Sequence, residues 1–169
     1  MKKQILRTLA IFCLIAILAS VGGSAFAEEA KFTSTKNFLA YLDENGIDYT
    51  YYGVNGKYEE VDITRRMDNY PSLTCEVHFR EDCEEVSLRI WDIIKAKADK
   101  EQVCAVLNTL NDGYKFVKFV YDESDATVQG EIDMYIDGDH CGRSVYDAMW
   151  ALFDVVDSDD AAKALDELD

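Results

Sequence analysis

The segment from Leu73 to Arg80 alternates apolar and polar residues without a break, and this pattern limits the fold more than any other stretch of the chain. Successive side chains of a strand point to opposite faces, so the pattern predicts a strand with one face against a core and one toward solvent. The apolar set is Leu73, Cys75, Val77 and Phe79, and the polar set is Thr74, Glu76, His78 and Arg80.

Further strands are predicted on both sides of this one. Residues 47–54 and 58–65 flank Asn55-Gly56, a pair that tolerates the positive φ angles of a two-residue hairpin turn. Other alternating segments are residues 86–90, 114–121 and 127–136. Cys75 is expected to face the core, close to Leu88 of the neighbouring strand.

Apolar residues at helical spacing predict four helices, each with a polar residue suited to an N-cap near its start. The helices span about residues 34–45, 99–111, 141–156 and 158–168, with Ser34, Asp99, Asp139 and Ser158 as the capping residues. The order α-β-β-β-β-α-β-β-α-α predicts an α+β domain with an antiparallel sheet and helices packed on one face.

Residues 1–27 are typical of a secretory signal peptide. A basic start precedes an uncharged apolar run over residues 8–21, and Ala25-Phe26-Ala27 supplies the small residues that a signal peptidase reads. Since a bilayer span needs about 20 residues, cleavage near Ala27 is expected over retention as an anchor. The sequence predicts a secreted or cell-envelope bacterial protein, with residues 28–169 as a single domain that does not stay inserted in the membrane.

The charge of the chain excludes some partners. The chain has 17 Lys+Arg and 33 Asp+Glu, and three of the basic residues lie in the leader, so residues 28–169 carry 14 basic and 33 acidic residues. This excess repels nucleic acid and anionic membrane surfaces. It is compatible with divalent cations, basic peptides or positively charged wall material.

Four cysteines remain after the leader is removed. An even number in an exported chain permits two disulfides with three connectivities, and free thiols are the alternative. No close Cys-x-x-Cys spacing occurs, so no metal site through sulfur is expected. The four are Cys75, Cys83, Cys104 and Cys141.

A motif in the second helix and the strand after it resembles the YbjN-like domain family. It comprises Leu107-Asn108-Thr109-Leu110-Asn111 followed by Tyr114-Lys115-Phe116-Val117, and the resemblance covers most of residues 34–157. The family is described as bacterial sensory-transduction regulators, with a fold similar to type III secretion chaperones. Those chaperones are dimers that hold extended segments of a partner. The resemblance implies no catalytic residue, and the leader separates this chain from the cytoplasmic chaperones.

The two histidines do not suggest a catalytic centre. His78 is predicted on the outer face of a strand and His140 in an acidic turn, and no nucleophile stands in a triad order with either. Glu131 and Asp133 alternate with apolar residues, which predicts a solvated strand face rather than a glycosidase pair.

Residues 137–142 begin like a calcium loop. However, Cys141 replaces an oxygen ligand at the fifth position, and Ala148 stands where a bidentate carboxylate is needed. A turn followed by a helix is the better interpretation. No metal, cofactor or catalytic residue is therefore predicted.

The predicted function is binding of a protein or peptide, with basic partners favoured, by a non-enzymatic and chaperone-like domain that forms a homodimer. Exposed aromatic and apolar side chains on the first hairpin and the second helix are the expected contact residues. These are Tyr49, Tyr51, Tyr52, Tyr58, Val103 and Leu107. The alternative is a small acidic envelope protein that binds cations or a small ligand.

Overall fold

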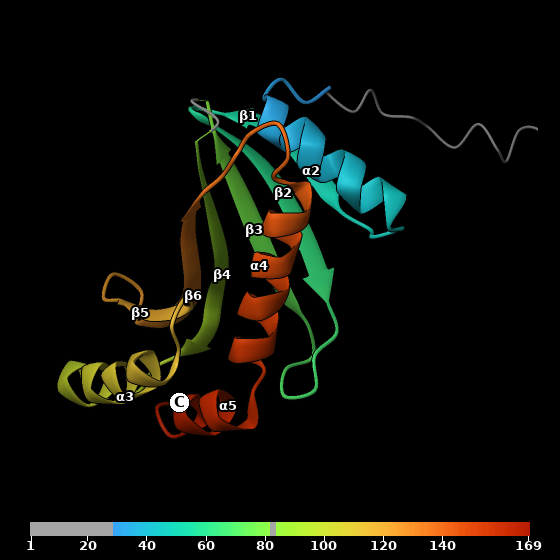
Figure 1. The fold of residues 1–169 in the computed structure, drawn as a ribbon. Helices are drawn as coiled ribbons and strands as arrows, with labels where there is room; N and C mark the ends of the chain where they lie inside the picture. The colour runs from blue at the N-terminus through green and yellow to red at the C-terminus, as the bar shows by residue number, and fades with distance from the viewer. Residues whose placement is uncertain (1–28, 82–83) are drawn as a thin grey trace, which may run out of the picture.

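The computed structural model describes residues 29–81 and 84–169 (Figure 1). The predicted leader and Cys83 lie outside these residues. The described elements, in chain order, are α2 (Thr33–Glu44), β1 (Thr50–Asn55), β2 (Tyr58–Arg65), β3 (Leu73–Arg80), β4 (Glu85–Lys95), α3 (Lys100–Gly113), β5 (Lys118–Asp122), β6 (Thr127–Tyr135), α4 (Gly142–Val156) and α5 (Asp159–Asp166). The predicted α+β class and element order are confirmed.

The strands form one six-stranded sheet in the order β1-β2-β3-β4-β6-β5. All neighbouring strands are antiparallel. β2 and β3 pair over their whole length, with Glu60 opposite His78 and Asp62 opposite Glu76. β1 and β5 are therefore the edges of the sheet, and β2 and β3 carry a continuous block of paired side chains.

One face of the sheet supports the core. α2 and α4 lie across this face, while α3 and α5 pack together at one end of the sheet (Figure 1). The rings of Phe38 on α2 and Phe79 on β3 meet at 5.5 Å between centroids. Val77, Phe79, Met149 and Phe153 are fully buried in this layer. Burial of such side chains is the main source of stability. Because the apolar side chains of each strand point into the core, the opposite face of the sheet is left for other roles.

Two glycines allow α4 to approach its neighbours. A Cβ on Gly130 of β6 would lie 2.9 Å from Val156 Cγ2, so the absence of a side chain lets α4 lie close to the sheet. A Cβ on Gly142 would lie 2.8 Å from the carbonyl oxygen of Asn37 and 2.8 Å from Tyr41 Cβ. Close contact between α4 and α2 therefore depends on glycine at the first residue of α4.

A buried carboxylate ties the start of α2 to β2. Glu59 is fully buried and accepts hydrogen bonds from the Lys31 N–H at 2.6 Å, the Phe32 N–H at 3.0 Å and the Tyr51 hydroxyl at 2.7 Å. Burial alone would raise the pKa of Glu59, but these hydrogen bonds outweigh it and lower the pKa. Glu59 thus acts as a charged anchor for the N-terminal end of α2.

Two helix starts differ from the prediction. α2 has Phe32 at its N-cap, and Ser34 lies buried in the first turn, because Glu59 takes over the role of the capping side chain. α4 begins after Cys141 rather than with a cap from Asp139. The predicted caps of α3 and α5, Asp99 and Ser158, are confirmed by their hydrogen bonds.

The strands also differ from the prediction in their bounds and pairing. β1 begins at Thr50 rather than at residue 47, and β5 begins at Lys118 rather than at residue 114, because pairing with β6 starts only at Lys118. β4 is longer than predicted and has a register shift between Ile90 and Ile94, with Asp92 at a φ of 50°. Leu88 pairs with Val77 rather than with Cys75, although Cys75 does face the core as predicted.

No disulfide joins any two of Cys75, Cys104 and Cys141, which lie on β3, on α3 and before α4. Burial raises the pKa of the Cys75 thiol, so this group stays protonated. None of the helices in residues 29–81 and 84–169 is long and apolar enough to cross a membrane.

Candidate functional site

The sheet face turned away from α2 and α4 is the candidate functional surface. Its strands place polar side chains here because their apolar neighbours point into the core, as on β3, where buried and partly exposed residues alternate strictly. Large aromatic side chains are also exposed on this face, which a purely solvated face does not need. We call it the open face, and its exposed aromatics are Tyr52, Tyr58, Trp91 and Tyr135.

A hollow of about 310 Å³ lies in the open face. Residues of β2, β3 and β4 and the last residue of β1 form it, so it spans neighbouring strands of the sheet. Tyr58 and Trp91 are its partly exposed aromatic side chains, at 38% and 40% exposure. The residues around the hollow are Asn55, Tyr58, Glu60, His78, Ser87, Arg89 and Trp91.

Three potential metal ligands meet beside this hollow. His78 Nε2 lies 3.4 Å from Glu76 Oε2 and 3.7 Å from Glu60 Oε2. The ligand atoms of Glu60, Glu76 and His78 all lie within 4.8 Å of one another. Trp91 Nε1 donates a hydrogen bond of 2.7 Å to Glu76 Oε2 and thereby orients that carboxylate. The antiparallel register of β2 and β3 creates this arrangement, since it sets Glu60 directly opposite His78.

Asp62 adds a third carboxylate next to Glu60 and Glu76. Burial, and then the negative charges of Glu76 and Glu60, raise the pKa of Asp62 from 3.8 to about 6, although a hydrogen bond with Tyr52 acts in the opposite direction. The charge of Asp62, and then burial and the charge of Glu60, raise the pKa of the Tyr52 hydroxyl. The open face therefore contains a local excess of negative charge that the fold itself does not neutralise.

The metal-free protein is expected to gain stability from Asp62→Asn at neutral pH. An acid whose pKa is raised by folding stabilises the fold fully below its unfolded pKa, and this stabilisation is lost as the pH rises through the folded pKa. Relative to the parent, Asp62→Asn should be more stable above pH 6 by about 1 kcal/mol after allowance for solvent screening. The gain should vanish below the unfolded pKa of 3.8. Chemical denaturation in the presence of a chelator at several pH values measures it.

Asp133, on the same face, provides a control of opposite sign. Burial would raise its pKa, but hydrogen bonds from Ser87 and Arg89 outweigh this and lower it. Its contribution to stability is present above the unfolded pKa and is lost as the pH falls through the folded pKa, so Asp133→Asn should destabilise the protein at neutral pH. If Asp62→Asn and Asp133→Asn changed the free energy of unfolding equally at neutral pH, the opposite pKa shifts given for the two carboxylates would be contradicted.

Two arginines on the open face, Arg80 and Arg89, form ion pairs with carboxylates. Arg89 contacts Glu131 at 3.2 Å and Asp133 at 2.8 Å. Arg80 contacts Glu85 at 2.7 Å, and its guanidinium lies 5.8 Å from the centre of the Tyr58 ring. The prediction that Glu131 and Asp133 lie on an outer strand face is confirmed. Both carboxylates pair with Arg89 of the neighbouring strand β4.

The predicted contact tyrosines divide between the two faces. Tyr52, at 59% exposure, and Tyr58 lie on the open face, as a partner surface requires. Tyr51 instead turns toward the core side and donates to Glu59. Tyr49 packs against the core and donates to Asp43.

The predicted contact residues of α3 are corrected by the structure. Val103 and Leu107 are buried, because they form the side of α3 that packs into the core. They are not available to a partner in this fold.

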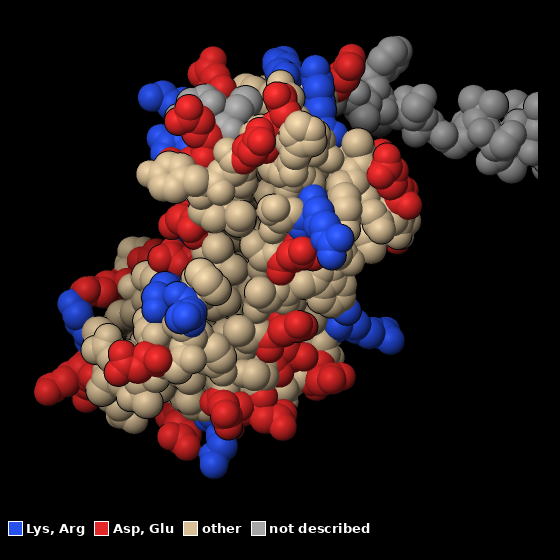
Figure 2. Space-filling view, in the orientation of Figure 1, with Lys and Arg blue, Asp and Glu red and all other residues tan. Residues whose placement is uncertain are grey.

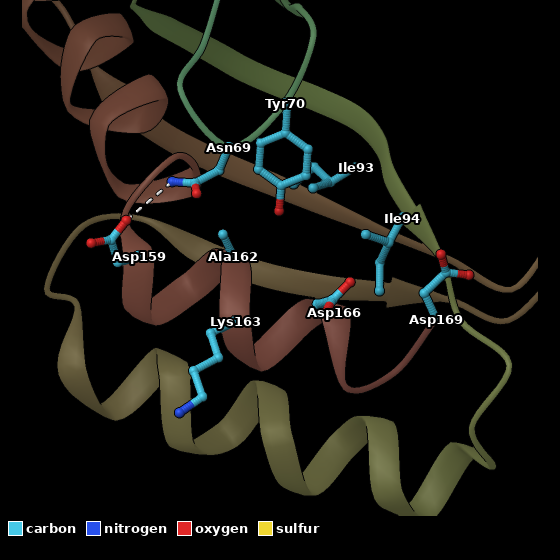
Figure 3. A pocket seen from close by; sticks show the side chains of 9 residues that line it. All are labelled: Asn69, Tyr70, Ile93, Ile94, Asp159, Ala162, Lys163, Asp166 and Asp169. Carbon is cyan, nitrogen blue, oxygen red and sulfur yellow. Dashed lines mark hydrogen bonds between the residues drawn. The ribbon is translucent and has the colours of Figure 1, made fainter.

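A second hollow, of about 530 Å³, lies between the β2–β3 connection, β4 and α5 (Figure 3). Asn69 and Tyr70 reach into it from the connection, and Lys163 points away toward α3. The Asn69 side chain donates to the Asp157 carbonyl at 2.6 Å and to Asp159 at 3.4 Å. These polar groups hold the connection against α5, so we assign the second hollow a structural role.

Acidic side chains are spread over the helical side of the molecule as well. Figure 2 shows this side, with Asp and Glu gathered around the α3 and α5 end and Lys and Arg more widely separated. The negative charge is therefore not confined to one patch. What distinguishes the open face is the combination of carboxylates, a histidine and exposed aromatic rings.

Sequence reasoning did not find the Glu60–Glu76–His78 cluster. His78 was predicted on an outer strand face, but its closest carboxylates come from two strands, and local spacing shows only one of them. The information that is missing is the pairing register of β2 and β3. This register can be derived once β3 is aligned as the next strand beside the hairpin of β1 and β2.

No known family model matches the chain, and no curated protein matches it. The resemblance of residues 34–157 to the YbjN-like domain family therefore stays a prediction from the sequence motifs.

Proposed function

We propose that this is an exported, non-enzymatic binding protein that uses its open face to bind a protein or peptide with basic side chains. The observation that carries the proposal is a sheet face, turned away from α2 and α4, whose aromatic side chains are exposed among carboxylates in the described residues. Aromatic side chains in a hollow are typical anchors of protein interfaces. Tyr58 and Trp91 border the same hollow and come from different strands.

Charge complementarity selects the class of partner. Glu60, Asp62 and Glu76 form an acidic row across β2 and β3, and burial together with the charges of Glu76 and Glu60 raises the pKa of Asp62. Lys or Arg side chains of a partner would relieve this repulsion and would also steer association. Two open faces of the same protein would instead bring like charges together, so a second copy is the less favoured occupant.

The open face is better suited to this role than the edge of the sheet. β1 is an edge strand, but a register shift between Tyr51 and Gly53, with Gly53 at a φ of 79°, interrupts its ladder. Bulges of this kind discourage the addition of another strand. Contact through side chains of the open face does not require a regular edge.

Affinity capture from the envelope fraction and medium of the producing cell tests the proposal. Wild-type protein should retain a basic partner that is released by salt, and Tyr58→Ala or Trp91→Ala should reduce retention by about tenfold, as expected for interface anchors.

Phe116→Ala is the matched control, because Phe116 is an exposed aromatic residue outside the hollow. It should retain the partner as the wild type does. A partner held equally by all three variants would show that the open face is not the binding surface.

A further inference from the structure

We propose that Glu60, Glu76 and His78 bind one divalent transition-metal ion, with Zn²⁺ the best fit. The proposal replaces the sequence-based expectation of no metal site, and it does not depend on the partner proposed above. The three side chains project from β2 and β3, two adjacent interior strands that pair over their whole length. Imidazole and carboxylate together suit Zn²⁺ and its transition-metal neighbours better than Ca²⁺, which takes oxygen ligands.

The distances from His78 to the two carboxylates agree with a shared ion, and the third pair of ligand atoms lies within 4.8 Å. A tetrahedral zinc site with bonds of about 2.1 Å places neighbouring ligand atoms about 3.4 Å apart. His78 Nε2 is 3.4 Å from Glu76 Oε2 and 3.7 Å from Glu60 Oε2. These contacts are longer than a hydrogen bond of good geometry, which is about 2.9 Å for nitrogen and oxygen.

Two polar atoms at the cluster have unmet bonding capacity. His78 Nε2 and Asp62 Oδ1 are both shielded from solvent, and neither makes a hydrogen bond within the described part of the chain. Buried polar atoms normally find a partner, and a bound cation would supply one to His78 directly. Asp62, opposite Glu76, provides further negative charge beside the ion.

The surroundings of the cluster resemble those of protein metal sites. The Trp91 indole N–H donates to Glu76 Oε2 at 2.7 Å, which is how outer groups orient a ligating carboxylate. Arg89, the neighbour of Glu76 on β4, directs its guanidinium to Glu131 and Asp133. The carboxylates of the cluster are thus left for another cation.

Titration calorimetry with Zn²⁺ tests the proposal on the purified protein after treatment with a chelator, at about 0.15 M salt to screen the general acidic surface. One equivalent per chain should bind, and His78→Gln and Glu76→Gln should each weaken binding by about tenfold or more. His140→Gln is the matched control, because the His140 side chain is 84% exposed in a loop beside Asp137. It should bind Zn²⁺ as the parent does.

A second readout locates the ion independently of affinity. In Trp150→Phe, Trp91 is the remaining tryptophan, and Co²⁺ bound at Glu76 should quench its fluorescence with the same stoichiometry. Binding only in several weak equivalents, unchanged in His78→Gln, would overturn the proposal. The cluster would then be a group of polar neighbours on the open face that does not hold an ion.

Discussion

Gly142→Ala is expected to lower the free energy of unfolding by about 2–3 kcal/mol, although alanine ordinarily favours a helix. The added Cβ would lie 2.8 Å from the Asn37 carbonyl oxygen and 2.8 Å from Tyr41 Cβ, and neither the backbone nor a Cβ can move aside cheaply. α2 and α4 must therefore separate, which loosens the helical layer behind the sheet. Denaturant unfolding measures the effect.

Gly113→Ala is the matched control for this substitution. Gly113 also lies at a helix end, but a Cβ there meets nothing within 4 Å. The substitution should be neutral or should stabilise the protein by up to about 1 kcal/mol. A similar loss in both variants would contradict the close approach of α4 to α2.

Glu59→Gln is expected to destabilise the protein by about 2–3 kcal/mol, because a charged acceptor of several hydrogen bonds is replaced by a group that also donates. The Lys31 N–H, the Phe32 N–H or the Tyr51 hydroxyl would lose its partner. Hydrogen exchange should rise in the first turn of α2, and denaturant unfolding gives the loss of stability.

Glu60→Gln is the control for Glu59→Gln, since Glu60 is the next residue of β2 but lies on the open face. Without metal it should be neutral or stabilising, because it removes repulsion from Asp62. The difference between the two variants should also depend on pH. Folding lowers the pKa of Glu59 below its usual 4.5, so its stabilisation is present above that value and is lost as the pH falls through the folded pKa. A difference that persists at low pH would contradict this role.

The sequence predicts most of the fold because the signals for it are local. Alternation in residues 73–80 gives both the bounds and the facing of β3. Asn55-Gly56 correctly indicates the first hairpin, but the two-residue turn is Gly56-Lys57, because Asn55 still pairs with Tyr58 as the last residue of β1. The helices are predicted for the same reason, because apolar residues at helical spacing mark the side of each helix that packs on the core, as Leu110 does in α3.

The errors arise where contacts are distant in the sequence. Glu59 alternates correctly as a core-facing residue, yet nothing in its neighbourhood shows that it binds the start of α2. Val103 and Leu107 were predicted as contact residues because an apolar helix side has the same sequence pattern whether a partner or the protein's own core covers it. Likewise, the sequence around Trp91 does not show that its indole N–H donates to Glu76 of the neighbouring strand.

Site-specific photocrosslinking tests the central claim, that the open face is the functional surface. A photoreactive residue replaces Tyr135, which is exposed on the open face outside the hollow, or, in a second protein, Ala151 on the exposed side of α4. Both proteins are exposed to the envelope fraction and medium of the producing cell. A discrete crosslinked partner that salt suppresses is expected from position 135, and none from position 151. The same partner crosslinked from position 151, with none from position 135, would place the functional surface on the helices and contradict a role for the open face.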